Sequence, residues 1–237
     1  MEKLSPVRAI VGRVMTPAGT ASDRPLRRDA ERNRQRILEA ARVVFAERGL
    51  SGSHDDIARE AGVGVGTVYR RFPEKEQLID ALFEDRIEAI GAMARAAAGD
   101  PDPWQGLVTF LVGMQEMQSE DRALKEIVLG GARGAERVAA ARELLIPIVG
   151  GIVQRAKDAG GLRADVELTD LPLLQLAIST ISEAAGDAAP DVWRRAMNIV
   201  LDGLRAESAT FKLVPTAIDE QQLDVVMASY GAARRRG

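Results

Sequence analysis

The feature that most constrains the fold of this chain is the helical spacing of its apolar residues. In the first such segment five apolar residues share one helix face: Ile37, Leu38, Ala41, Val44 and Phe45. A repeat near 3.6 residues predicts amphipathic helices. No segment shows a convincing alternation of apolar and polar residues, so the chain is predicted to be all-α.

Glycine and proline divide this pattern into separate helices. The predicted helices cover 29–48, a short segment through 60, 64–72, 73–98, 103–118, 120–130, 135–159, 169–186, 190–206 and 219–230. The clearest internal break is the sequence GDPDP at 99–103. The predicted domains are a flexible basic arm (1–28), a three-helix domain (29–75) continued by the long helix 73–98, a second helical domain (100–206) and a C-terminal extension (207–237).

Two local signals mark helix ends in the first domain. Gly49 follows the first helix in the position that a C-terminal cap favours. Ser53 precedes Asp56 by three residues, which is the spacing of a capping box at the start of a helix.

Composition excludes several kinds of chemistry. The chain of 237 residues contains no Cys and a single His, His54. Thiol catalysis, disulfides and Cys-based zinc sites are therefore excluded, and an HExxH zinc site lacks its second histidine. No metal or cofactor is expected. No signal-peptide pattern and no run near the roughly 20 apolar residues of a membrane span occurs, so no membrane partner is expected and a cytoplasmic location is predicted.

Charge is distributed unevenly along the chain, whose net charge is -3. Residues 1–75 hold 15 Lys and Arg against 10 Asp and Glu, whereas residues 76–237 hold 17 against 25. A basic first third on an acidic body indicates two roles in one chain, and chance variation is the alternative. One arginine cluster is expected to be solvated, with contact to a nucleic-acid backbone as the alternative: Arg24, Arg27, Arg28, Arg32, Arg34 and Arg36.

Residues 53–75, SHDDIAREAGVGVGTVYRRFPEK, contain two short predicted helices joined by a glycine turn. Ile57 and Ala61 share one face of the first helix, and Val68 and Phe72 share one face of the second. One helix can therefore brace the other. This is the arrangement of a helix-turn-helix, whose second helix enters the DNA major groove.

With its apolar face turned inward, the second helix presents groups suited to DNA on the opposite side. Gly66 allows close approach, and Thr67 can contact a base edge or a phosphate. Arg70 can read guanine through two hydrogen bonds, and Arg71 can hold a phosphate. Lys75, in the first turn of the next helix, is disfavoured by the helix dipole unless an anion binds there. The alternative is an ordinary solvated helix face.

Nucleotide-binding loops fit the sequence poorly. The GVGVG run at 62–66 follows no predicted strand, and the dinucleotide-binding spacing fails because Thr67 stands where the last glycine belongs. No Lys is followed by Ser or Thr, so a Walker A loop is absent from the sequence.

The run IAREAGVGVGTVYRRFPEKEQLI resembles the N-terminal signature of TetR/AcrR-type transcriptional regulators. Upstream, RQRILEAARVVFAERG resembles the first helix of that family. The resemblance covers roughly residues 30–85, and its motifs are specific in combination. Beyond residue 100, PDPWQGL and DVWRRAMNIVLDGL resemble one subgroup less specifically.

The resemblance implies an all-helical homodimer with a three-helix helix-turn-helix domain and a larger ligand-binding and dimerisation domain. The residues expected to contact DNA, from the helix face and the matching motif positions, are His54, Val65, Gly66, Thr67, Tyr69, Arg70, Arg71 and Lys75. Two features depart from the family pattern. Gly64 replaces the frequent Ser or Thr N-cap, and Asp55 and Asp56 bring acidic groups near the DNA.

The second domain offers two candidate surfaces, each with ordinary helix core as the alternative. Candidates to line an effector cavity are Trp104, Phe110, Met114, Met117, Ile127, Leu144, Ile148 and Ile152. Family resemblance places the dimer interface on the last two strong helices, with Leu174, Ile178, Ile181, Trp193, Met197, Val200 and Leu204 as candidates. Pro147 falls inside a predicted helix, where a kink would open space for a ligand.

The sequence thus predicts a regulator that is not an enzyme and binds double-stranded DNA. The most specific form of this prediction is a homodimeric repressor that binds a pseudo-palindromic operator and is released by a small-molecule effector. The alternatives are an all-α ligand-binding module or enzyme without a DNA-binding role, and a helical interaction scaffold.

Overall fold

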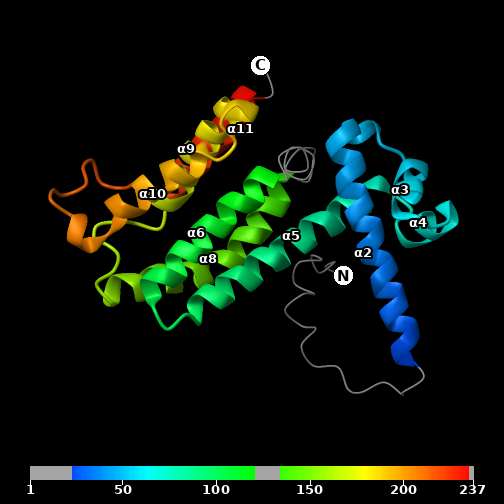
Figure 1. Ribbon diagram of the computed structural model, residues 1–237, viewed down its shortest axis with the longest axis horizontal. Coiled ribbons are helices and arrows are strands. Elements are labelled where there is room, and N and C mark those ends of the chain that lie inside the picture. Colours follow the sequence, from blue (N-terminus) through cyan, green and yellow to red (C-terminus); the bar gives the residue numbers. More distant parts are fainter. Residues whose placement is uncertain (1–22, 121–133, 235–237) are drawn as a thin grey trace. The chain divides into compact units, whose positions relative to one another are not determined.

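The computed structural model describes residues 23–120 and 134–234, which divide into two compact units (Figure 1). Of the described residues, 23–90 and 134–144 belong to the first unit, and 91–120 and 145–234 belong to the second. Within the described residues the regular structure is helical, apart from one isolated bridge between Leu162 and Arg205. The all-α prediction is therefore confirmed. Most of the predicted arm and of the helix at 120–130, including Ile127, lies outside the described residues.

The first unit is built from α2 (Asp23–Arg48), α3 (His54–Ala61), α4 (Val65–Arg71) and the first part of α5 (Lys75–Ala98). Helix α3 packs against both α2 and α4. Fully buried side chains from all four helices form its core: Ile37, Leu38, Phe45, Ile57, Val68, Leu78 and Leu82. The periodicity that predicted these helices also identifies their buried faces.

Helix α2 begins at Asp23, so the predicted start at Asp29 and the predicted end of the arm at residue 28 are corrected. Pro25 lies in the first turn of this helix. The first four backbone N–H groups of a helix have no partner inside it, so a proline there removes no helical hydrogen bond. The sequence prediction treated this proline as part of an irregular arm, although it is compatible with a helix start.

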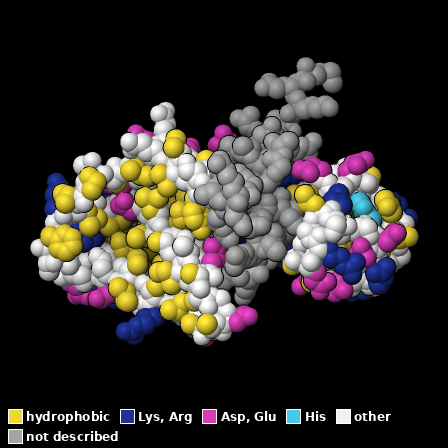
Figure 2. Space-filling view, turned by 90° about the horizontal axis from the view of Figure 1, so that it is seen from above, with side chains coloured by type: hydrophobic (Ala, Val, Ile, Leu, Met, Phe, Trp, Pro, Cys, Tyr) yellow, Lys and Arg dark blue, Asp and Glu magenta, His cyan; other side chains and the backbone are white. Residues whose placement is uncertain are grey.

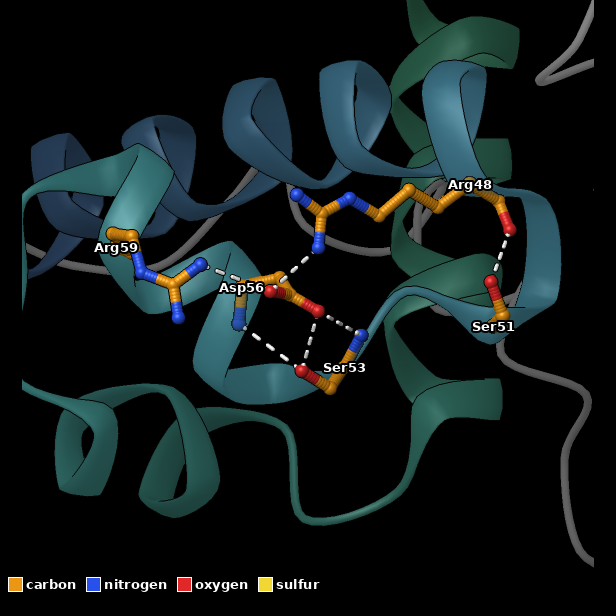
Figure 3. A network of polar contacts seen from close by, with 5 residues as sticks. All are labelled: Arg48, Ser51, Ser53, Asp56 and Arg59. Atoms are coloured by element: carbon orange, nitrogen blue, oxygen red, sulfur yellow. Dashed lines mark hydrogen bonds and ion pairs between the residues drawn. The ribbon is translucent and has the colours of Figure 1, made fainter.

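A network of hydrogen bonds fixes the start of α3 (Figure 3). The Asp56 backbone N–H donates to Ser53 Oγ over 3.1 Å, while the Ser53 backbone N–H and hydroxyl donate to Asp56 Oδ2 over 3.1 and 2.6 Å. Arg48 and Arg59 both donate to Asp56 Oδ1, over 2.8 and 3.0 Å. The predicted capping box is confirmed, and α2 is tied to the start of α3.

The turn after α3 is closed by Gly62, whose φ of +62° lies in the left-handed region that glycine favours. Its N–H donates to the carbonyls of Ala58 and Arg59. From α2, Arg36 Nη2 donates to Ala61 O over 2.8 Å. Arg36 therefore has a structural contact, although it belongs to the arginine cluster that was expected to be solvated.

The second unit contains α6 (Pro103–Glu120), the later part of α8 (Gly134–Asp158), α9 (Asp170–Ala185), α10 (Val192–Leu204) and α11 (Glu220–Arg234). Helix α9 packs against α6 and α10. Short 3-10 turns occupy Gly49–Ser51 in the first unit and Gly186–Ala188 and Ala206–Ser208 in the second. Pro147 lies inside the continuous helix α8.

The C-terminal extension is attached to the body of the second unit. Thr169 Oγ1 donates to the Ile218 carbonyl over 2.7 Å, and the Leu213 N–H donates to Asp165 over 2.9 Å. Leu223 of α11 is buried. The apolar side of this predicted amphipathic helix is therefore used in part for docking within the chain.

Removing the cap of α3 should loosen that helix. Ser53→Ala is expected to cost about 1 kcal/mol, so protected amides of α3 should exchange about fivefold faster. Hydrogen exchange of the peptide covering 53–61 measures this change. Unchanged exchange in that peptide, with α9 peptides as the internal reference, would contradict the structural role of the cap.

The same network predicts a defined pH dependence. Hydrogen bonds from Ser53, then from Arg59, together with the charge of Arg48, hold the pKa of Asp56 well below its ordinary value of about 3.9. The stabilisation is therefore fully present above that ordinary value and is lost as pH falls through the lowered pKa. Exchange of the 53–61 peptide should differ most between wild type and Asp56→Asn at neutral pH. A difference that grows on acidification would have the wrong sign.

Candidate nucleic-acid interface

The outward face of α4 is open along its length. Val65 and Tyr69 are exposed, as are Arg70 and Arg71. A Cβ atom placed on Gly66 would meet nothing within 4 Å. The backbone of α4 is therefore bare at this position and accessible to a large partner.

The opposite face of α4 is buried, as its apolar spacing predicted. Val68 has no exposed surface, and Phe72, which caps the helix, is also buried. The Phe72 N–H donates to the Val68 carbonyl over 2.8 Å. Thr67 is half-buried between the two faces. At the N-terminus, Gly64 makes no side-chain cap, in agreement with its departure from the family pattern.

Lys75 begins α5 directly after the turn that follows α4. Its Nζ donates to the Leu50 carbonyl over 2.6 Å, which ties the start of α5 to the connection between α2 and α3. An ammonium group has three N–H donors. The contact with Leu50 therefore leaves donors for a further acceptor beside the helix N-terminus.

His54 lies in a different environment from the other candidate contacts. Its side chain is only 8% exposed, and its imidazole stacks on the Tyr69 ring with centroids 4.6 Å apart. Its Nε2 lies 2.8 Å from the Phe72 carbonyl oxygen. The structure thus brings His54 to Tyr69, at the contact between α3 and α4.

The two acidic residues at the start of α3 lie in different surroundings. Asp55 is exposed, whereas Asp56 is paired with Arg48 and Arg59. These two arginines expose much of their side chains and were not singled out in the sequence. The sequence could have indicated the Asp56–Arg59 ion pair, because residues three apart in one helix are neighbours on its surface.

Figure 2 shows Lys and Arg side chains gathered on the surface of the first unit.

The effector candidates differ in burial. Trp104, Phe110 and Ile152 are buried. Those that are only partly buried are Met114, Met117, Leu144 and Ile148. The Arg205 guanidinium lies 4.9 Å from the centre of the Trp104 ring. A Cβ on Gly161 would fall 2.8 Å from that side chain, so Trp104 is held closely within its own unit.

The dimer candidates separate by burial. Four of them are buried within the protomer: Ile178, Trp193, Met197 and Leu204. Leu174 and Val200 are partly buried, whereas Ile181 is 41% exposed. Ile199 of α10, which was not among the candidates, is 65% exposed. Hydrophobic side chains also gather on the face of the second unit seen in Figure 2.

Among the described residues, no helix combines the length and apolar character needed to cross a membrane. In the same residues, no three His, Cys, Asp or Glu side chains are grouped as metal ligands would be.

Two family models match the chain. The model described as bacterial regulatory proteins, tetR family, matches residues 37–82. The model described as transcriptional regulator SbtR-like, C-terminal domain, matches residues 102–206. The two matches coincide with the helix-turn-helix region and with the helices from α6 to α10.

A curated relative resembles the N-terminal region alone. An HTH-type transcriptional regulator of Staphylococcus aureus strain USA300 is 48% identical over 54 residues, which are 22% of this chain and 29% of that protein. The match therefore spans less than a third of the relative's length.

Two solved structures extend the comparison to most of the chain. A TetR transcription regulatory protein from Mycobacterium vanbaalenii is 35% identical, with a TM-score of 0.62, over 76% of this chain and 99% of that one. A TetR transcriptional regulator from Streptomyces coelicolor is 28% identical, with a TM-score of 0.59, over 73% of this chain and 98% of that one. The chain belongs to the TetR family of bacterial transcription regulators. The prediction that it is not an enzyme agrees with this membership.

Proposed function

We propose that the chain is a sequence-specific double-stranded DNA-binding regulator that places α4 in the major groove. The observation that carries the proposal is the open outer face of α4, where bare backbone at Gly66 adjoins exposed Tyr69, Arg70 and Arg71. A helix-turn-helix reads DNA with such a face, and the N-terminal residues of its second helix contact base edges. Membership in the TetR family supports the same function.

The exposed groups divide between base and phosphate contacts. Arg70 has the donor geometry to read guanine, and Val65 and Thr67 can pack against a thymine methyl group. Arg71 and Lys75 supply charge to the phosphate backbone, and the Tyr69 hydroxyl can donate to it. The N–H groups at the start of α5 favour an anion beside Lys75.

Binding as a homodimer is the second part of this proposal, because the two-fold symmetry of a dimer is matched by a pseudo-palindromic operator. A dimer with two such helices requires half-sites about 34–36 Å apart, or at a multiple of this spacing, in a pseudo-palindrome. The exposed Ile181 and Ile199, with the partly buried Leu174 and Val200, support a dimer face on α9 and α10. The buried members of the predicted set stabilise each protomer instead.

Repression relieved by a small apolar effector is the regulatory form of this proposal. The effector would bind within residues 100–206, beside partly buried residues such as Met114, Met117 and Ile148. It releases DNA only if it binds the non-DNA geometry more tightly, and a coupling free energy of about 1–3 kcal/mol changes DNA affinity about 5–150-fold. Such a regulator acts on the chromosome, in the cytoplasm.

Arg137 supports a mechanical link through which a movement of α8 reaches the start of α5. This buried arginine forms ion pairs with Glu76 and Asp80, which lie in the first two turns of α5. Its Nε donates to Asp80 Oδ1 over 3.0 Å. A movement of this part of α8 would therefore act on α5 close to Lys75.

Selection from random double-stranded DNA tests the proposed function directly. The purified protein of 237 residues should recover one pseudo-palindrome. The Tyr69→Ala/Lys75→Ala variant should lose binding while keeping its helicity and its dimeric sedimentation. Lys212→Ala, which removes an exposed lysine from the second unit, is the control and should bind normally. A folded dimer that recovers no sequence at low salt would refute the proposal.

The salt dependence of binding tests the phosphate contacts. DNA affinity should fall steeply with salt because each neutralised phosphate releases counterions. Lys75→Ala should lower the slope of log K against log salt by about 1. Titrations of the selected operator at several salt concentrations measure the slope, and an unchanged slope would exclude Lys75 as a phosphate contact.

Gly66 tests the close approach of the α4 backbone. Gly66→Ala should preserve or raise stability, by up to about 1 kcal/mol, because the added methyl group meets open space. It should weaken operator binding by about tenfold, equivalent to 1.4 kcal/mol, because the methyl group stands between helix and DNA. Gly151→Ala, also open and inside a helix, is the matched control. Wild-type affinity of Gly66→Ala would place the DNA away from this position.

A further inference from the structure

His54 is the first residue of α3, and its side chain crosses to α4 rather than facing solvent. It contacts α4 in two places, the Tyr69 ring and the Phe72 carbonyl. These residues lie three positions apart, near the end of the helix. One side chain therefore fixes both the end of the α4 backbone and an exposed side chain on its outer face.

The contact with Phe72 determines the role of one ring nitrogen. A carbonyl oxygen only accepts hydrogen bonds, so His54 Nε2 is the donor in this 2.8 Å contact. This hydrogen bond gives the N–H of the buried His54 ring, a residue that is only 8% exposed, its acceptor. The hydrogen bond also fixes the orientation of the imidazole plane.

The fixed imidazole covers one face of Tyr69. The two rings are nearly parallel, with an interplanar angle of 15° and centroids 4.6 Å apart, which is a stacked geometry favoured by aromatic pairs. Half of the Tyr69 surface stays exposed. The phenol is therefore presented in one orientation before any partner arrives.

We propose that His54 is a positioning residue that acts on DNA affinity through Tyr69 and does not itself contact DNA. The inference rests on the proposed DNA-binding function and changes the role expected for His54 from the sequence. Its ring face and its Nε2 are already engaged within the protein. A side chain held ready for its partner loses less conformational freedom on binding, so the stack favours the complex.

A double-mutant cycle on the selected operator separates positioning from direct contact. His54→Ala is expected to weaken binding about tenfold in the wild-type background and less than about twofold in the Tyr69→Ala background. Titrations at low salt keep every variant measurable, because binding strengthens steeply there. Equal losses in both backgrounds would show that His54 contacts DNA directly, and would overturn the proposal.

His54→Phe supplies the conservative rescue. Phenylalanine can stack on Tyr69 but cannot donate to Phe72, so it should restore most of the affinity that His54→Ala loses. If His54 only stabilised the fold, His54→Ala would lower the melting temperature and leave the operator affinity of the folded protein at the wild-type value. That result would also overturn the proposal.

The orientation of Tyr69 can be measured without DNA. The ring protons of Tyr69 should shift in the NMR spectrum of His54→Ala, because the stacked imidazole is removed, and should shift less in His54→Phe. Unchanged Tyr69 shifts in His54→Ala would contradict the stack. A wild-type protein that selects no DNA would refute the proposed function, whereas an operator-binding protein with an additive cycle refutes this inference alone.

Discussion

The proposed recognition surface depends on a helix that is too short to be stable by itself. Helix α4 spans only Val65–Arg71 and lacks a side-chain N-cap, whereas isolated helices shorter than about 12–15 residues are marginal in water. Its conformation must therefore come from packing, through buried Val68 and Phe72. This explains why α3 is so firmly fixed at both ends: the shape of α4 is only as well defined as the helix that braces it.

Electrostatics at the start of α3 follow from the same requirement. An acidic pair near a DNA-binding surface is unfavourable for binding, yet Asp56 is needed to close the capping box. Its charge is offset by Arg48 and Arg59, which still expose much of their side chains. The first turn of α3 thus keeps a stabilising carboxylate whose charge is paired with two arginines. The basic character of the N-terminal third serves the fold as well as the proposed binding of DNA.

Helical spacing predicted most elements of this fold because the buried faces of the longer helices are regular. It placed α5 and α9 within about two residues of their observed ends, and the Ser53–Asp56 spacing identified the cap. The start of α2 was missed because residues 23–28 were included in the predicted flexible arm, although a first-turn proline such as Pro25 costs no hydrogen bond. The role of His54 was also beyond the sequence, because the Tyr69 stack depends on how α3 and α4 pack.

Periodicity is least informative where an apolar stripe on a helix is wider than the surface that the protomer buries. In α9, Ile178 and Ile181 are separated by three residues and belong to one predicted stripe, yet the first is buried in the protomer and the second is exposed. When the apolar stripe is wider than the surface that other helices of the protomer cover, the residues at its edge stay exposed. Residue spacing does not show where the buried part of the stripe ends, whereas the burial of each side chain does. Ile181 and Ile199 of α10 stay exposed in the protomer, which is why the dimer face that we propose includes them.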